Sequence, residues 1–371
     1  MPLFKSNSWA GKHSPDYVII LSTFFLVIFG LVMLASASSD LGQLRFGDSY
    51  FYLKHQLLYG LSVGLIGFFL ASKFYYRNYQ NIAVILFILS ILMLTLIFTP
   101  LGITRGGATR WLGIGPVQFQ PSELLKITFI VYLASWLGNK SYRQKSFFGG
   151  FVPFLIIIGL IGILLILQPS TSIAAILILT ALIIYFSSGA KLSYIFSAIL
   201  LGIFAFLIIS YLSPYRWERI MSFVNPGLDT QSSSYQINQA LIAVGSGGLK
   251  GVGYGQSTTK LFYLPQPIDD SIFAVIAEET GFIGSAVLIM VFLMLTTRSF
   301  LLARKINDEF GQLLLIGFGS LITIQAFIHI GAISGLIPLT GVPLPYISYG
   351  GTALAIFMTI SGIIVNISKY T

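Results

Sequence analysis

The stretch that decides the fold is LPQPIDDSIFAVIAEETGFIGSAVLIMVFLMLTT, residues 264–297. From residue 271 onward it is an apolar run long enough to cross a membrane as a helix, because about 20 residues cover about 30 Å of hydrocarbon. Two adjacent carboxylates, Asp269 and Asp270, precede the run, and two more, Glu278 and Glu279, lie inside it. A charge inside a membrane is energetically expensive, so these four acids are candidates for a buried or functional role.

The same apolar pattern recurs along the whole chain. Hydrophobic residues make up 56% of the sequence and charged residues 9%, with a mean hydropathy of +0.87, whereas soluble proteins average about 25% charged residues. Apolar runs that could span a bilayer occupy residues 17–39, 55–72, 80–99, 122–138, 149–168, 171–188, 191–212, 271–297, 311–337 and 349–368. The sequence therefore predicts an all-α, polytopic membrane protein of about ten transmembrane helices, folded as a single membrane domain over residues 1–371.

The basic residues predict how the chain is oriented. Lys and Arg between the spans favour a cytoplasmic N-terminal segment, residues 1–16, and a cytoplasmic C-terminus after an even number of spans. Three irregular segments then share the outer face: 99–123, the long extracytoplasmic loop 213–270 between the seventh and eighth helices, and 338–352. We expect them to form the walls of one outward-facing pocket, with short helices in 213–270 and a stiff non-helical backbone in the Pro-rich and Gly-rich 338–352.

Overall charge and composition limit the classes of ligand. The net charge of +9 suits cytoplasmic loops that lie on anionic membrane lipid, and the sequence gives no separate reason to expect a nucleic acid partner. The chain has no cysteine, and its three histidines are scattered, so it predicts no thiolate or histidine metal site. The glycines of 245–256, GSGGLKGVGYGQ, contain a GxGxG, but no strand precedes them and a turn-rich loop is the better interpretation.

Glu123 and Lys126 stand three residues apart at the start of the fourth predicted helix, which places them on one face. Two interpretations are open. The pair forms a salt bridge that lets the helix enter the membrane, or it lines the polar floor of the outer pocket.

The acids of the opening stretch differ in position. Glu278 and Glu279 are about 100° apart around a helix, so they cannot both face one cavity, and we expect one of them to be structural. Asp270 lies about two turns above Glu278, near the helix N-terminus, where a carboxylate can stay ionised and act as a general base. The alternative is that Asp269 and Asp270 only cap the helix.

Several cations share the predicted outer face with Asp270. They are Arg105, Arg110, Arg216, Arg219 and Lys260. Cations beside a carboxylate are what a site that handles a phosphorylated lipid requires.

Five segments together resemble the SEDS family, which includes FtsW and RodA. They are RWLGIGPVQFQPSELLK (110–126), YRWERIMSFVNP (215–226), SSSYQINQALIAVGSGGLKGVGYG (232–255), KLFYLPQPIDDSIFAVIAEETGFIG (260–284) and PLTGVPLPYISYGGT (338–352). The resemblance spans nearly the whole chain. The length of the 213–270 loop and the KLFYLP sequence are closer to the cell-division member FtsW than to the elongation member RodA.

The resemblance implies a peptidoglycan glycosyltransferase that polymerises lipid II into glycan strands at the outer face of the cytoplasmic membrane. It implies that Asp270 is the catalytic acid, and it places Arg110, Glu123, Lys126, Arg216, Arg219 and Lys260 on family motif positions, with Asp269, Glu278 and Glu279 as supporting acids. It also implies a class B penicillin-binding protein as the crosslinking partner, other cell-division proteins, and a role at the septum. A divalent cation, Mg²⁺ or Mn²⁺, is a candidate to share the binding of pyrophosphate.

The chain departs from the family pattern at a few positions. Residues other than the usual ones stand at Gln266, Ile268, Asp269, Ser271 and His329, and Ser170 stands where an Asp is usual. Two explanations are open. The extra acid Asp269 compensates for the acid that is missing at position 170, or the acid at position 170 is not needed.

Two other classes of function stay open. A transporter that flips the lipid-linked precursor should carry polar residues at several depths of the membrane, whereas here the acids and cations gather on one face. A scaffold without catalysis would tolerate replacement of Asp270.

Overall fold

The computed structural model describes residues 13–105, 108–114, 117–138, 143–224, 233–260 and 264–371. Helices occur at all ten predicted spans. Their bounds are Tyr17–Phe46 (α1), Phe51–His55 with Ser62–Lys73 (α2 and α3, joined by a π-helical turn over Gln56–Leu61), Arg77–Leu96 (α4), Pro121–Gly138 (α5), Val152–Leu167 (α6, after a π-helical turn over Phe147–Phe151), Thr171–Ser187 (α7), Leu192–Tyr211 (α8), Ile272–Lys305 (α11), Glu309–Ile333 (α12) and Gly351–Ser368 (α13). The polytopic helical prediction is confirmed.

Eight of these helical segments are long and apolar enough to cross a membrane. The other two are α7, which is apolar but only 17 residues long, and α5, which carries Glu123 and Lys126 in its first two turns. The chain is therefore a multi-pass membrane protein in which the two marginal helices lie among longer ones.

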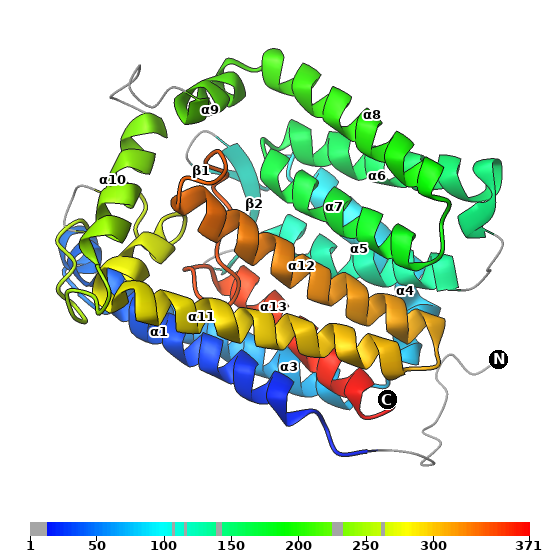
Figure 1. Ribbon diagram of the computed structural model, residues 1–371, viewed down its shortest axis with the longest axis horizontal. Coiled ribbons are helices and arrows are strands. Elements are labelled where there is room, and N and C mark those ends of the chain that lie inside the picture. Colours follow the sequence, from blue (N-terminus) through cyan, green and yellow to red (C-terminus); the bar gives the residue numbers. More distant parts are fainter. Residues whose placement is uncertain (1–12, 106–107, 115–116, 139–142, 225–232, 261–263) are drawn as a thin grey trace.

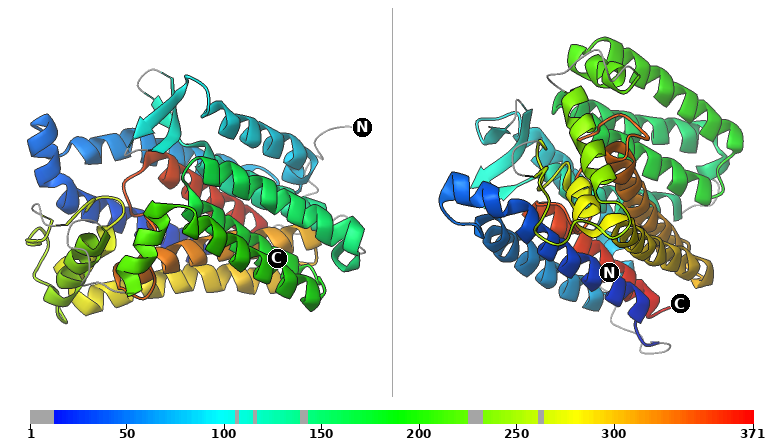
Figure 2. Two further views of the ribbon diagram at one scale, coloured as in Figure 1. Left: turned by 90° about the horizontal axis from the view of Figure 1, so that it is seen from above. Right: turned by 60° about the vertical axis from the view of Figure 1, so that its left-hand side comes forward.

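The central helices are α12 and α13, and α8 lies at the edge. In their most apolar windows, 78% of α13 and 67% of α12 is buried inside the protein, but only 6% of α8 is. Figure 1 shows α8 along the rim, and Figure 2 shows α13 packed among other helices. The apolar surface of α8 therefore faces the surroundings, as a lipid-exposed helix does.

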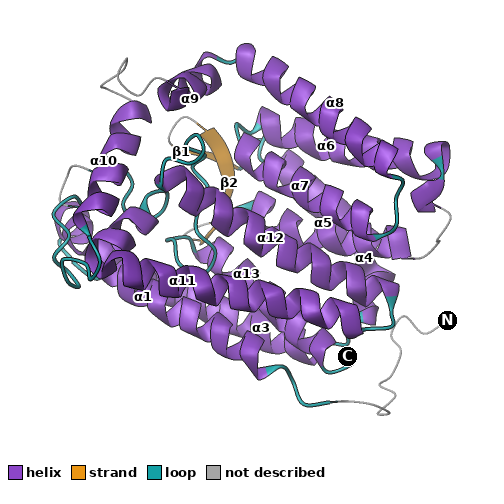
Figure 3. Cartoon of the chain, viewed as in Figure 1, coloured by secondary structure: helices purple, strands orange, loops and turns teal. Residues whose placement is uncertain are grey.

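The first outer segment contains a small sheet that the sequence analysis did not predict. Strands Gly102–Arg105 (β1), Ala108–Ile114 (β2) and Val117–Phe119 (β3) pair antiparallel in the order β1-β2-β3, and they are the strands in Figure 3. Leu112 of β2 is opposite both Gly102 and Phe119. The sheet leads directly into α5 and so fixes the start of the helix that carries Glu123.

The second outer segment forms two short helices, as predicted. They are Pro214–Val224 (α9) and Ser233–Ser246 (α10). These helices gather toward the end of the molecule opposite the C-terminus in Figure 1. At the other end, the amide of His13 donates to the carbonyl of Lys369, 2.9 Å away, so the first described residues lie beside the C-terminus.

Helix α11 is interrupted at Gly281, whose φ of 67° and ψ of −166° are not helical. The glycine-rich loop fills the break with backbone hydrogen bonds: Val252 and Gly253 donate to the carbonyls of Glu278 and Glu279, at 2.9 and 3.1 Å. In return, Phe282 donates to the carbonyl of Gly248 at 2.9 Å. These bonds satisfy backbone groups that the membrane could not.

The glycines of this loop are needed because two backbones approach closely. A Cβ on Gly281 would lie 2.3 Å from the amide nitrogen of Gly251, and a Cβ on Gly251 would lie 2.2 Å from the carbonyl oxygen of Glu279. The interpretation of 245–256 as a turn-rich loop is confirmed, and its glycine pattern serves helix packing.

We predict that Gly281→Ala lowers the free energy of unfolding by about 2 kcal/mol or more, because alanine disfavours the positive φ and its methyl group collides with Gly251. Thermal unfolding in detergent measures the loss. Gly202→Ala is the matched control, since a Cβ there meets no atom within 4 Å, and should be neutral or slightly stabilising. Equal stability of the two variants would contradict the packing account.

Candidate active site

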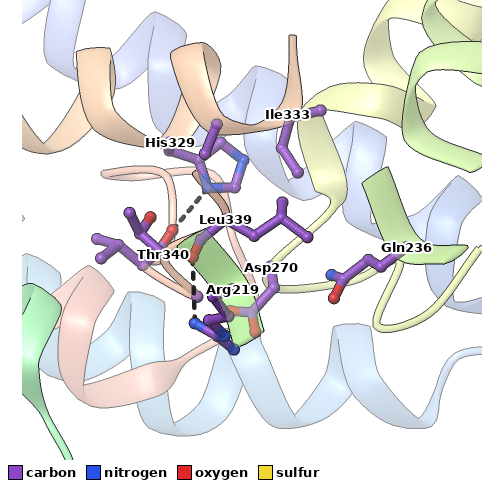
Figure 4. A pocket seen from close by; sticks show the side chains of 10 residues that line it. Arg219, Gln236, Asp270, His329, Ile333, Leu339 and Thr340 are labelled. Carbon is purple, nitrogen blue, oxygen red and sulfur yellow. Dashed lines mark hydrogen bonds between the residues drawn. The ribbon is translucent and has the colours of Figure 1, made fainter. Parts of the chain in front are cut away.

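Asp270 lies just before α11 in a pocket that residues of α9 and α10 also line. The residue preceding the helix is Ser271, and no side chain caps the helix start there. The capping interpretation of Asp269 and Asp270 is therefore not supported. The pocket is lined by Arg219, Gln236, Asp270, His329, Ala332, Ile333, Leu339, Thr340, Gly341 and Val342, which Figure 4 shows converging from α9, α10, α12 and the non-helical segment 338–342.

The charge state of Asp270 reflects opposing influences. Burial raises the pKa of its carboxyl group, and the positive charges of Arg219 and then Arg110 lower it. Both arginines were predicted to share a face with Asp270. They come from separate outer elements, Arg219 from α9 and Arg110 from β2. The geometry thus places cations beside a half-buried carboxylate, an arrangement suited to an anionic substrate.

Both arginines also donate hydrogen bonds to backbone carbonyl groups. Arg219 donates from Nη1 to the carbonyl of Leu339 at 3.2 Å, and Arg110 donates from Nε to the carbonyl of Gln168 at 3.3 Å and from Nη2 to that of Pro169. Their guanidinium groups are held in position before any ligand binds.

Asp269 faces a different cavity from Asp270. This second cavity, of about 410 Å³, is lined by Asp40, Leu41, Leu44, Arg45, Lys260, Leu264, Pro265, Gln266, Pro267, Ile268 and Asp269. Burial and the neighbouring charge of Asp270 raise the pKa of Asp269 to about 7. The two adjacent acids therefore have different surroundings.

Sequence reasoning missed Asp40 and Arg45. The predicted first span ends at residue 39, but α1 continues to Phe46 and carries both side chains to the second cavity. Their position directly after an apolar run was the available signal.

Glu278 is fully engaged by protein. Its carboxylate accepts hydrogen bonds from the hydroxyls of Ser257, at 2.5 Å, and Thr259, and from the amide of Thr258, at 3.1 Å. It anchors the loop that precedes the Asp269–Asp270 segment.

Glu279 is also engaged by protein, although we expected only one of the two glutamates to be structural. It forms a buried ion pair with Lys260 at 2.8 Å and accepts from the Ser36 hydroxyl at 2.6 Å. Lys260 lines the second cavity, but its ammonium group is held by Glu279, Ser36 and the carbonyl of Gly255. The two glutamates bind different parts of one loop because they point in different directions around α11.

Glu123 and Lys126 form the predicted pair, with 2.7 Å between Oε1 and Nζ, and both side chains are buried. Lys126 also donates to Oε1 of Gln325 at 2.9 Å, and Gln325 donates to the carbonyl of Pro343 at 2.8 Å. The salt-bridge interpretation is supported, and the pair belongs to a network that reaches the wall of the Asp270 pocket.

The segment 338–343 has no helical hydrogen bonds, and side chains hold its carbonyl groups. The carbonyl of Leu339 accepts a hydrogen bond from Arg219, and that of Thr340 accepts one from the Ser172 hydroxyl at 2.6 Å. The carbonyl of Val342 accepts from His329 Nδ1 at 2.6 Å, and that of Pro343 accepts from Gln325. The non-helical prediction for this segment is confirmed. Sequence reasoning did not assign roles to Ser172, Gln325 or His329, although each is a polar residue within an apolar helix.

Arg216 is half-buried on α9, one turn before Arg219, and it is not among the residues that line either cavity. Within the described ranges there is no group of three or more His, Asp or Glu side chains that could hold a metal ion.

Known proteins resemble the chain over almost its full length. The family model for FtsW, RodA and SpoVE, described as cell cycle protein, matches residues 16–371. Stage V sporulation protein E of Bacillus subtilis (strain 168) is 37% identical over 361 residues, which cover 97% of this chain and 98% of that protein. The probable peptidoglycan glycosyltransferase FtsW of Geobacter sp. (strain M18) is 36% identical over 354 residues, covering 95% and 96%.

Solved structures share the fold. A peptidoglycan synthase complex, described as coordinating polymerization and crosslinking, contains a chain with a TM-score of 0.76 and 25% identity, covering 95% of this chain and 97% of that one. The rod shape determining protein RodA of Thermus thermophilus has a TM-score of 0.71 at 23% identity, covering 98% of each chain.

We predict that Lys260→Met costs about 3–5 kcal/mol of unfolding free energy, because it leaves the buried carboxylate of Glu279 without its cation. Adding Glu279→Gln should recover part of the loss, and thermal unfolding of the single and double variants measures it. Lys54→Met is the control: Lys54 pairs with Asp48 at 2.7 Å on the surface, so its loss should cost less than about 1 kcal/mol. A Lys260 variant no less stable than the Lys54 variant would contradict the buried-pair account.

We predict that Asp269→Asn stabilises the protein more at pH 8 than at pH 4. The folded-state pKa of Asp269 is about 7, above the unfolded value near 3.9, so ionisation disfavours the folded state as pH rises through this window. Asparagine does not ionise, and the difference in melting temperature between variant and wild type should grow from about pH 4 to 7 and then level off. A difference that does not change with pH would contradict the raised pKa.

Proposed function

The chain belongs to the FtsW, RodA and SpoVE family of cell cycle proteins, and on that basis we propose that it polymerises lipid II into glycan strands, with Asp270 as general base. The single observation that carries this proposal is the Asp270 carboxylate, which is half-buried in a pocket that Arg219 also lines and which feels the positive charges of Arg219 and Arg110.

The chain is a peptidoglycan glycosyltransferase, as its relatives of 36–37% identity over nearly their full length are named. The chemistry of such an enzyme is a displacement at a sugar carbon. A hydroxyl of one lipid-linked disaccharide attacks the anomeric carbon of another, a carbon–oxygen bond forms, and the bond to the pyrophosphate breaks. The electron pair of that bond leaves with the polyprenyl pyrophosphate.

Asp270 takes the proton of the attacking hydroxyl in this scheme. A positioned general base contributes about 10²–10⁴-fold to the rate. The base must be ionised, and Arg219 and Arg110 favour ionisation against the effect of burial. With one carboxylate in the pocket, a single displacement with inversion is the expected course, because the leaving pyrophosphate needs little protonation.

The cations divide into two groups in this proposal. Arg110 and Arg219, beside Asp270, bind the pyrophosphate, and Arg216 on the same helix as Arg219 meets substrate at the pocket mouth. The second group, which we expected to contact or support substrate, instead shapes the site through the contacts described above. It consists of Lys260 and Lys126, with the glutamates Glu123, Glu278 and Glu279.

A divalent cation remains part of the proposal only as a companion of the substrate. The described residues provide no cluster of three metal-binding side chains, and Asp269 and Asp270 face different cavities. The protein groups therefore do not fit a metal site of their own, and no step above depends on one.

The cellular setting is also proposed. The similarity to a chain of a peptidoglycan synthase complex that coordinates polymerization with crosslinking supports a class B penicillin-binding protein as partner. The FtsW relatives support a septal role among cell-division proteins. In this setting both termini are cytoplasmic and the Asp270 pocket opens to the outer face of the cytoplasmic membrane.

We predict that Asp270→Asn lowers glycan-strand formation at least about 100-fold, because the amide cannot accept the proton. Purified protein, reconstituted with its cognate transpeptidase and supplied with lipid II, is the system to measure. Asp269→Asn is the matched control and should keep most of the activity.

Undiminished polymer from Asp270→Asn would remove this base from the mechanism. Absence of polymer from the wild type with its partner would favour the transport or scaffold alternatives instead.

A further inference from the structure

Gly341 lines the pocket beside Asp270 and Arg219, and it has no side chain to fill the pocket there. A Cβ built on this glycine would lie 3.3 Å from Oδ2 of Asp270 and 3.8 and 3.9 Å from Nη1 and Nη2 of Arg219. A methyl group at this position would contact the carboxylate and lie close to the guanidinium group, so its absence lets a ligand atom approach between them. A reacting atom needs such a position, within reach of the base and of a positive charge.

The space is held open by a fixed backbone. Gly341 has a φ of +63° and stands between Thr340 and Val342, whose carbonyl groups are bonded at 2.6 Å by Ser172 and His329. Figure 4 shows Thr340, Leu339 and His329 grouped on one side of the pocket, with Arg219 and Asp270 below them. These bonds come from two different helices, so the segment cannot easily move to close the space.

The surroundings favour a neutral hydroxyl as the occupant. A phosphate oxygen beside Oδ2 would be repelled by the ionised carboxylate, whereas a hydroxyl can donate to it. His329 lines the same pocket, and its Nδ1 donates to the carbonyl oxygen of Val342, so its Nε2 is the ring nitrogen left for another partner. That Nε2 is buried and has no hydrogen-bond partner among the described residues.

We propose that the attacking sugar hydroxyl sits in the space beside Gly341, and that the missing side chain there is a requirement of the reaction. This inference rests on the proposed function. The hydroxyl donates its proton to Asp270 while its oxygen forms the new bond to the anomeric carbon, and the negative charge that develops on the departing pyrophosphate is stabilised by Arg219 and Arg110.

The test is Gly341→Ala, which places a methyl group in the space. Reconstituted with its transpeptidase and lipid II, this variant should form glycan strands at least about 100-fold more slowly, because a displacement of about 1 Å costs this much. Gly335→Ala is the matched control: Gly335 also has a positive φ, +71°, and the atom nearest to its Cβ would be at the end of the Leu241 side chain, at 3.3 Å. It carries similar backbone strain without filling the space, and it should retain activity.

A loss of activity in Gly341→Ala could come from a blocked pocket or from misfolding. The Gly341→Asn variant distinguishes the two, because asparagine tolerates a positive φ better than alanine. Its thermal unfolding should show that it is folded, and it should form glycan strands as slowly as Gly341→Ala. A folded Gly341→Ala or Gly341→Asn that polymerises as fast as Gly335→Ala would overturn the inference. Activity retained by Asp270→Asn would instead overturn the assignment of the base, so the two failures are distinguishable.

Discussion

The structure depends on one constraint, which is that backbone N–H and C=O groups inside a membrane must find partners within the protein. Two helical interruptions near the site would leave such groups free. At Gly281 the partners are backbone groups of the loop 248–253, and in 338–343 they are the side chains of Arg219, Ser172, His329 and Gln325. Irregular backbone is what brings Asp270 and Gly341 together, and these partners make it tolerable.

The polar groups of the core are arranged around the same two interruptions. Lys126 reaches the 338–343 segment through Gln325, while Lys260 and Glu279 join α1 to the loop that precedes Asp269. Burying such charges is costly unless they are paired and hydrogen-bonded. The pairs therefore contribute chiefly by fixing positions, and the cations left beside the pocket, Arg110 and Arg219, are the ones suited to substrate.

Much of the fold was predictable, because hydropathy reports the spans directly and a spacing of three residues reports the Glu123–Lys126 pair. The sequence also placed Asp270 outside its helix. The small sheet of 102–119 was not predictable, since its short strands alternate weakly among glycines. Neither was the partner of Lys260, because Glu279 and Ser36 are distant in sequence, nor the separation of Asp269 and Asp270 into two cavities, which depends on tertiary packing. Gly341 resembled any loop glycine until the distances around it were known.

The pairing of the glycine-rich loop with the break in α11 has a mechanical consequence. The loop follows α10 directly, and its four backbone bonds tie it to both sides of Gly281. The position of α10 is therefore coupled through these bonds to α11 around Gly281, the helix that the two aspartates precede. The position of the Asp270 carboxylate is in this way linked to the packing of α10.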